Sequence, residues 1–134
     1  MTTLGTIAVL AFLSGISAAV AQETMHSIEC SFDRVCSWAE GCRDQNMEFG
    51  FAFDPGTGFG LMSGNVGASL VEVSFGQNLL GTQIVSFVER LPSGVIQSTT
   101  LTERGNAVHS RHTVIAGEIV PTQNYGTCEL EAWW

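Results

Sequence analysis

The chain contains no lysine: its cations are five arginines, against 13 Asp and Glu residues, and its formal net charge is −8. Without lysine, Schiff-base and P-loop chemistry are excluded. A chain this acidic is also unsuited to nucleic acid, whose phosphates attract basic surfaces. The 134 residues, 45% of them hydrophobic, are too few for a second ordinary domain and too apolar for a disordered chain.

Several catalytic and metal-binding motifs are also absent. The sequence has no G-x-S-x-G, which a nucleophile elbow requires, and no C-x-x-C of the kind used in redox and zinc sites. The 13 acidic residues offer many carboxylate pairs for glycoside cleavage, but no spacing selects one pair. The sequence therefore predicts no metal and no cofactor, and it identifies no catalytic residue.

The first 21 residues are predicted to be a secretory signal peptide. An apolar stretch from Leu4 to Val20 leads into Ala19, Val20 and Ala21 and is followed by polar residues. This is an apolar core with a small-x-small cleavage site, and it is short for a membrane helix of ~20 residues. We expect cleavage after Ala21, a single domain over residues 22–134, and a periplasmic or secreted location.

Four cysteines in an exported protein predict two disulfides, for which three pairings exist. Cys30 lies on the apolar face of one alternating segment, and Cys128 lies on the less polar face of another. If the first and last strands are neighbours, these two sulfurs can meet. We therefore predict the pairs Cys30–Cys128 and Cys36–Cys42, of which the longer loop contributes more to stability.

The rest of the chain predicts about eight short strands and no helix. No sustained 3.6-residue period occurs after the signal segment, whereas stretches rich in Val, Ile, Thr and aromatics recur between turn residues. The predicted strands are 27–32, 47–53, 59–62, 68–75, 82–91, 95–102, 107–115 and 119–130. They favour an all-β antiparallel meander that closes into a barrel over a two-sheet sandwich, because closure removes free edges and accounts for the long disulfide.

Some of these segments resemble a known group of proteins. The stretches FVERLPSG, AVHSRHTVIAGEIVP and YGTCE, with the front pattern CSF-x3-C-x5-C, resemble an uncharacterised group of small exported bacterial proteins. That resemblance covers most of the mature chain and implies an export signal and a disulfide-bonded β-domain. In general shape, a small exported barrel with a terminal Y-x-G-x-C-like strand is also similar to periplasmic inhibitors of c-type lysozyme. Their Ser-Gly-x-x-Tyr loop has no counterpart here.

The densest polar cluster is His109-Ser110-Arg111-His112. On a strand, residues three apart point to opposite faces, so the two imidazoles are not expected to share a metal. One hypothesis is a polar patch or ligand contact made by His109, Arg111 and His112. The other is a core histidine with a satisfied hydrogen bond, next to a solvated histidine and arginine.

Trp38 is the first choice for a binding residue outside this cluster. It lies in the short loop between Cys36 and Cys42, and a disulfide-constrained loop presents an aromatic side chain at low entropic cost. The alternative is that Trp38 folds over the end of the barrel as a plug.

The terminal residues Trp133 and Trp134 raise the question of an outer-membrane barrel. The alternation expected of a membrane-spanning strand fails at Glu131 and Glu129, and most predicted strands are shorter than the 9 to 11 residues that a bilayer requires. We therefore expect a soluble protein with no membrane span after signal cleavage.

These observations favour a soluble, exported, non-enzymatic β-barrel that binds a protein or a small ligand, in the manner of an inhibitor module. Its acidity would suit a basic exported or envelope protein as partner. A small ligand requires a hollow interior, and small barrels are often filled by their own side chains. The alternatives are a hydrolase-type enzyme that uses His109 or His112, and a structural component of the cell envelope.

Overall fold

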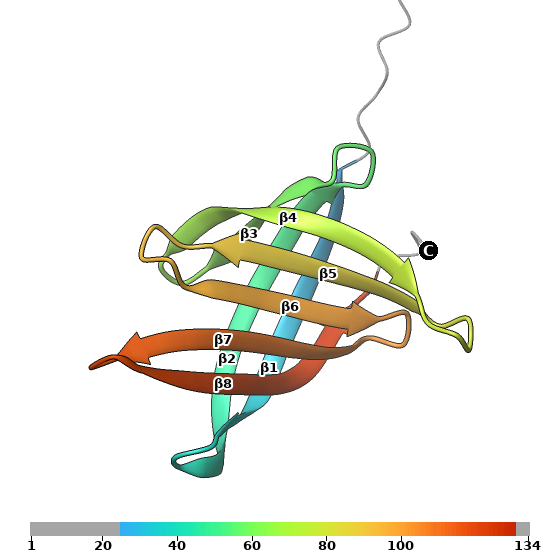
Figure 1. Ribbon diagram of the computed structural model, residues 1–134. Coiled ribbons are helices and arrows are strands. Elements are labelled where there is room, and N and C mark those ends of the chain that lie inside the picture. Colours follow the sequence, from blue (N-terminus) through green and yellow to red (C-terminus); the bar gives the residue numbers. More distant parts are fainter. Residues whose placement is uncertain (1–24, 131–134) are drawn as a thin grey trace, which may run out of the picture.

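The computed structural model describes residues 25–130, which form a closed barrel of eight antiparallel strands (Figure 1). The strands are β1 (His26–Ser37), β2 (Gly41–Asp54), β3 (Phe59–Gly64), β4 (Gly67–Gln77), β5 (Gln83–Arg90), β6 (Ile96–Thr102), β7 (Asn106–Ile115) and β8 (Glu118–Glu129). The predicted signal peptide, residues 1–21, lies outside the described residues, as do Trp133 and Trp134. Over residues 25–130, no helix is long and apolar enough to cross a membrane.

The barrel is a simple meander, as predicted, and not a sandwich. Each strand pairs with the next in sequence, and β1 pairs with β8 to close the cylinder. Cys30 lies directly opposite Cys128 across this closing pair, and both disulfides are those predicted, Cys30–Cys128 and Cys36–Cys42. The first bridge therefore joins the two ends of the sheet, and the second joins β1 to β2 near their turn.

The expectation that most strands are short was wrong. Strands β1 and β2 contain 12 and 14 residues and continue past the cysteine cluster to a turn of three residues. A β-bulge between Phe32 and Arg34 shifts the register, so the apolar alternation of β1 is interrupted while its backbone pairing continues. Cys36 lies opposite Cys42, and the hairpin projects beyond the rest of the barrel (Figure 1).

The hydrophobic core fills one end of the barrel. Phe51 and Phe87 stack with ring centroids 4.1 Å apart, and Phe53 meets Phe87 edge to face at 5.2 Å. The buried cluster consists of Ile28, Cys30, Phe32, Phe51, Phe53, Met62, Val71, Val73, Val85, Phe87, Leu101, Ala107 and Cys128. This end carries the β2–β3, β4–β5 and β6–β7 turns, so the packed core supports the barrel from that side.

Candidate functional site

Toward the opposite end, the inward-facing side chains of β5 to β8 change from apolar to polar. Strand alternation places every second residue inside, and the registers align these residues in rows across the strands. We call the first row beyond the core the inner polar row; it consists of Thr99, His109 and Asn124. The next, the outer polar row, consists of Glu89, Gln97 and Arg111.

The barrel is hollow at this end. A cavity of about 570 Å³ opens between the hairpins, and all members of the two polar rows except Thr99 line it. Its apolar lining consists of Met47, Phe49, Met62, Leu91 and, at the exposed β3–β4 turn, Val66, with the polar residues Asn65 and Ser69 among them. We call this cavity the cup. Its volume lies within the range of ~300 to 1,000 Å³ that is typical of small-molecule sites.

His109 forms the floor of the cup. Its side chain is 3% exposed, its Nδ1 lies 2.8 Å from Thr99 Oγ1, and its ring centroid lies 4.9 Å from that of Phe49. Burial, with a smaller contribution from the charge of Arg111, lowers the pKa of His109 to about 4, although Glu89 acts in the opposite direction. At neutral pH the imidazole is therefore uncharged and available as a hydrogen-bonding group.

Asn124 ties three strands together beside this histidine. Its Nδ2 donates a hydrogen bond to the backbone oxygen of His109 at 3.1 Å, and its Oδ1 accepts one from Gln45 Nε2 at 2.8 Å. These bonds connect β8 to β7 and, across the interior, to β2. The polar floor is therefore held in place before any ligand arrives.

The outer polar row carries two opposite charges. Glu89 is 5% exposed and accepts a hydrogen bond from Gln97 Nε2. Gln97 on β6 pairs with Glu89 on β5 and with Arg111 on β7. Strand β6 therefore lies between the strand that carries the carboxylate and the strand that carries the guanidinium. Arg111 is exposed, whereas Glu89 is enclosed.

The structure separates the residues of the predicted histidine cluster. His109 and Arg111 face the cup, whereas His112 lies opposite Pro121 on the outer surface and is exposed. The two imidazoles therefore lie on opposite faces of β7, as the strand period predicts, and cannot act together on one molecule. Among the described residues, no group of three His, Cys, Asp or Glu side chains could hold a metal ion.

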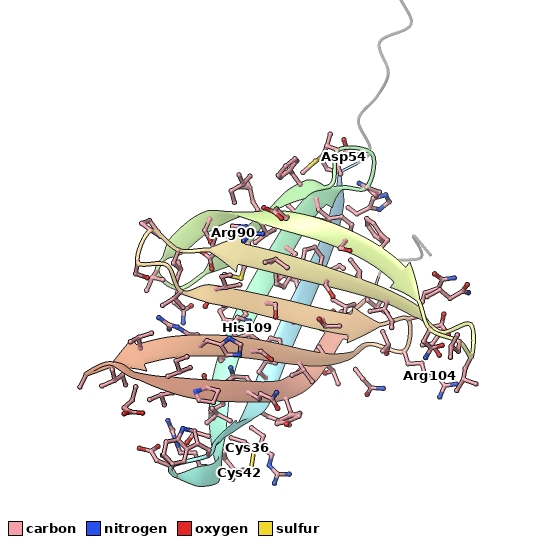
Figure 2. All side chains as sticks on the ribbon, in the orientation of Figure 1. Cys36, Cys42, Asp54, Arg90, Arg104 and His109 are labelled. Atoms are coloured by element: carbon pink, nitrogen blue, oxygen red, sulfur yellow. A yellow bond between two sulfur atoms is a disulfide. The ribbon has the colours of Figure 1, made fainter. Side chains whose placement is uncertain are left out.

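Trp38 lies at the turn of the β1–β2 hairpin and is 73% exposed. The alternative that it plugs the barrel was therefore wrong, because the long hairpin carries it past the cylinder. Figure 2 shows the Cys36–Cys42 disulfide near the end of this hairpin and His109 on β7.

Sequence reasoning missed Glu89, Gln97, Thr99 and Asn124 as members of the site. A signal for Glu89 was present, because it follows Val85 and Phe87 at the same strand parity and is the first charged residue on that apolar face. The rows themselves depend on the register between strands, which the sequence does not display.

The pKa of His109 predicts a stability that falls in mild acid. Its folded value, about 4, is below the ordinary value of 6.5, so the unfolded chain binds the proton more readily. Above pH 6.5 His109 is unprotonated in both the folded and the unfolded chain, and the full stability is present. As the pH falls from 6.5 toward 4, only the unfolded chain takes up the proton, so stability is lost. Between pH 7 and pH 5 we expect the free energy of unfolding to decrease by about 2 kcal/mol through this residue.

Urea unfolding at both pH values would measure this effect. His109→Asn, which keeps a polar atom near the position of Nδ1, should show a smaller loss between pH 7 and pH 5 than the wild type. His112→Asn, on the exposed face of the same strand, is the matched control and should lose as much as the wild type. Equal losses in all three proteins would contradict the assignment.

No protein-family model matches this chain, and no match was found among the curated proteins or the solved structures.

Proposed function

We propose that this protein is a soluble, exported, non-enzymatic binding module that holds a small molecule in the cup. The observation that carries the proposal is the cavity of about 570 Å³ inside one end of a barrel whose other end is packed. Two disulfides support an oxidising compartment, either the periplasm or the exterior. The acidic composition agrees with a role that does not involve nucleic acid.

The lining of the cup supports binding of a molecule with an apolar body and at least one polar group. Met47, Phe49 and Met62 offer apolar area, which supplies most of the affinity in such sites. His109 and Asn124 of the inner polar row would orient the ligand, and because their side chains already have partners, little ordering is needed on binding. This arrangement of an apolar wall facing fixed polar groups is typical of a preformed ligand site.

The same geometry gives little support to the hydrolase-type alternative. Only one of the two histidines faces the cup, and its Nδ1 is engaged with the Thr99 hydroxyl and not with a carboxylate. A structural role in the envelope would not require a hollow end. Ligand binding is the function that uses the features found at the cup.

A substitution that fills the cup should weaken binding. Ser69 lies inside on β4 and lines the cup, whereas its neighbour Leu70 points outward and is 64% exposed. With the neutral fluorescent probe N-phenyl-1-naphthylamine, we expect Ser69→Phe to weaken binding at least ~10-fold, which corresponds to about 1.4 kcal/mol. The matched control Leu70→Phe should bind as the wild type does. No fluorescence increase with the wild type, or an equal one with both variants, would contradict the proposal.

A second candidate function is supported by Trp38. An indole that is 73% exposed, on a hairpin fixed by the Cys36–Cys42 disulfide, suits contact with another protein. The net charge of −8 would favour a basic exported or envelope partner, and the resemblance to lysozyme inhibitors points in the same direction. Trp38→Ala would weaken such a complex, whereas Ser69→Phe, inside the cup, would leave it intact.

A further inference from the structure

Glu89 is the one acidic side chain that the structure buries among residues 25–130, and it lies on the wall of the cup. It is 5% exposed and follows Phe87, a core residue, at the same strand parity. An enclosed carboxylate is costly unless a cation or several hydrogen-bond donors compensate it. The partners of this carboxylate therefore indicate what the cup is suited to receive.

Inside the barrel, Glu89 has a neutral partner only. Gln97 Nε2 donates a hydrogen bond to Oε2. The salt bridge that the described residues form is on the outer surface, between Arg90 and Glu72 at 3.1 Å. No residue within the described barrel thus supplies a cation to the enclosed carboxylate.

The two basic residues that line the cup do not fill this role. His109 is uncharged at neutral pH, because burial lowers its pKa to about 4. The backbone of Arg111 on β7 lies two strands from that of Glu89 on β5, roughly 10 Å at the usual spacing between strands. The Arg111 residue is exposed to solvent. Gln97 stands between the two charges in the row.

The charge of the whole molecule also favours a positive ligand. Of the charged residues that line the cup, Glu89 and Arg111 face inward, whereas Glu48 alternates with the inward-facing Met47 and Phe49 and is exposed; the whole chain carries −8. A negative field of this kind draws cations toward the site. Phe49 adds an aromatic ring on the opposite wall, where a cation or an apolar group can pack against its face.

We propose that the cup selects an organic cation, an ammonium or guanidinium group attached to a small apolar body, whose charge pairs with Glu89. The inference rests on the proposed function, because it names the class of ligand for the same cavity. The apolar body would lie along Met47, Phe49 and Met62. The charged group would lie next to the Glu89 carboxylate, beside Gln97.

Three small probes of similar size test this selection by isothermal titration calorimetry at pH 7. They are 2-phenylethylamine as the cation, 2-phenylethanol as its neutral counterpart and 3-phenylpropanoate as the anion. We expect the wild type to bind the amine at least ~10-fold more tightly than the alcohol and to bind the anion most weakly. The amine preference should also decrease as salt is added, because the attraction is partly screened.

Glu89→Gln removes the charge and keeps the shape, so it should bind the amine and the alcohol equally. Glu72→Gln, an exposed acid on β4, is the matched control and should keep the preference. The wild-type comparison needs no variant, so the inference stays testable even if Glu89→Gln does not fold. Equal affinities for the three probes, or tightest binding of the anion, would overturn the inference.

These outcomes are distinct from failure of the proposed function. If the wild type binds N-phenyl-1-naphthylamine in the cup but shows no preference for the amine, the choice of ligand class is overturned and the binding function stands. If neither that neutral probe nor any of the three phenyl compounds binds, both proposals fail.

Discussion

Replacing Cys30 and Cys128 together by alanine is expected to lower the free energy of unfolding by about 4 to 5 kcal/mol. The bridge joins residues 98 positions apart, and in the chain-entropy model the denatured state gains most freedom when a long loop is released. Domains of this size have a total stability of only ~5 to 15 kcal/mol. The variant should therefore unfold at a much lower urea concentration.

The position of this bridge adds to the expected loss. Both cysteines are at least 93% buried in the core cluster, and they lie opposite each other in the β1–β8 pair that closes the barrel. Removal of the sulfurs leaves space within the packed end, and the surrounding side chains fill such space only in part. The closing pair would be left with its backbone hydrogen bonds and the remaining side-chain contacts.

The second disulfide is the matched control. Cys36 and Cys42 are only six positions apart, so their replacement by alanine should cost about 2 kcal/mol in the same model. This bridge lies on the projecting hairpin and not among the core residues. Urea unfolding of both double variants measures the difference. An equal loss in the two would show that loop length and core position do not govern the contribution of either bridge.

Gly126→Ala is expected to destabilise the barrel by about 3 kcal/mol or more, because no space exists for a Cβ atom. Gly126 lies in β8 opposite Phe32 of β1 and Ala107 of β7. A Cβ built there overlaps the backbone oxygen of Ser31 and comes within 2.7 Å of the Phe32 Cα. These are backbone atoms, so the clash is relieved only if the two closing strands move apart beside the Cys30–Cys128 bridge.

Gly76→Ala provides the comparison for this substitution. Gly76 also lies within a strand, β4, but a Cβ there meets nothing within 4 Å. We expect its stability to stay within about 0.5 kcal/mol of the wild type. Thermal unfolding followed by circular dichroism would measure both variants. A Gly126→Ala protein as stable as Gly76→Ala would mean that the strands accommodate the methyl group by a small shift.

Much of the fold follows from local patterns. The alternation of apolar and polar residues identifies strands, and the turn residues separate them, because strand side chains point to alternate faces. The parity of Cys30 and Cys128, together with the assumption that the first and last strands are neighbours, predicted their pairing, which the structure confirms. Even the opposite orientation of His109 and His112 follows from a period of two.

Other features could not be predicted from local patterns. The bulge after Phe32 breaks the alternation without ending the strand, so β1 and β2 are longer than their apolar pattern suggests. The same extension moves Trp38 away from the barrel end. The size of the cavity also depends on how side chains from eight strands meet, and a count of apolar residues does not report that.

The amino-acid pattern alone predicted the all-β class, the two disulfides and the apolar face of several strands. The three-dimensional arrangement decided where the inward residues gather: apolar ones fill one end, whereas the inner and outer polar rows align across neighbouring strands at the other. The physical reason is that alternation is a property of one strand, but a row of side chains depends on the register between strands. Register is set by turns, bulges and barrel closure, so the cup exists only once the whole sheet has formed.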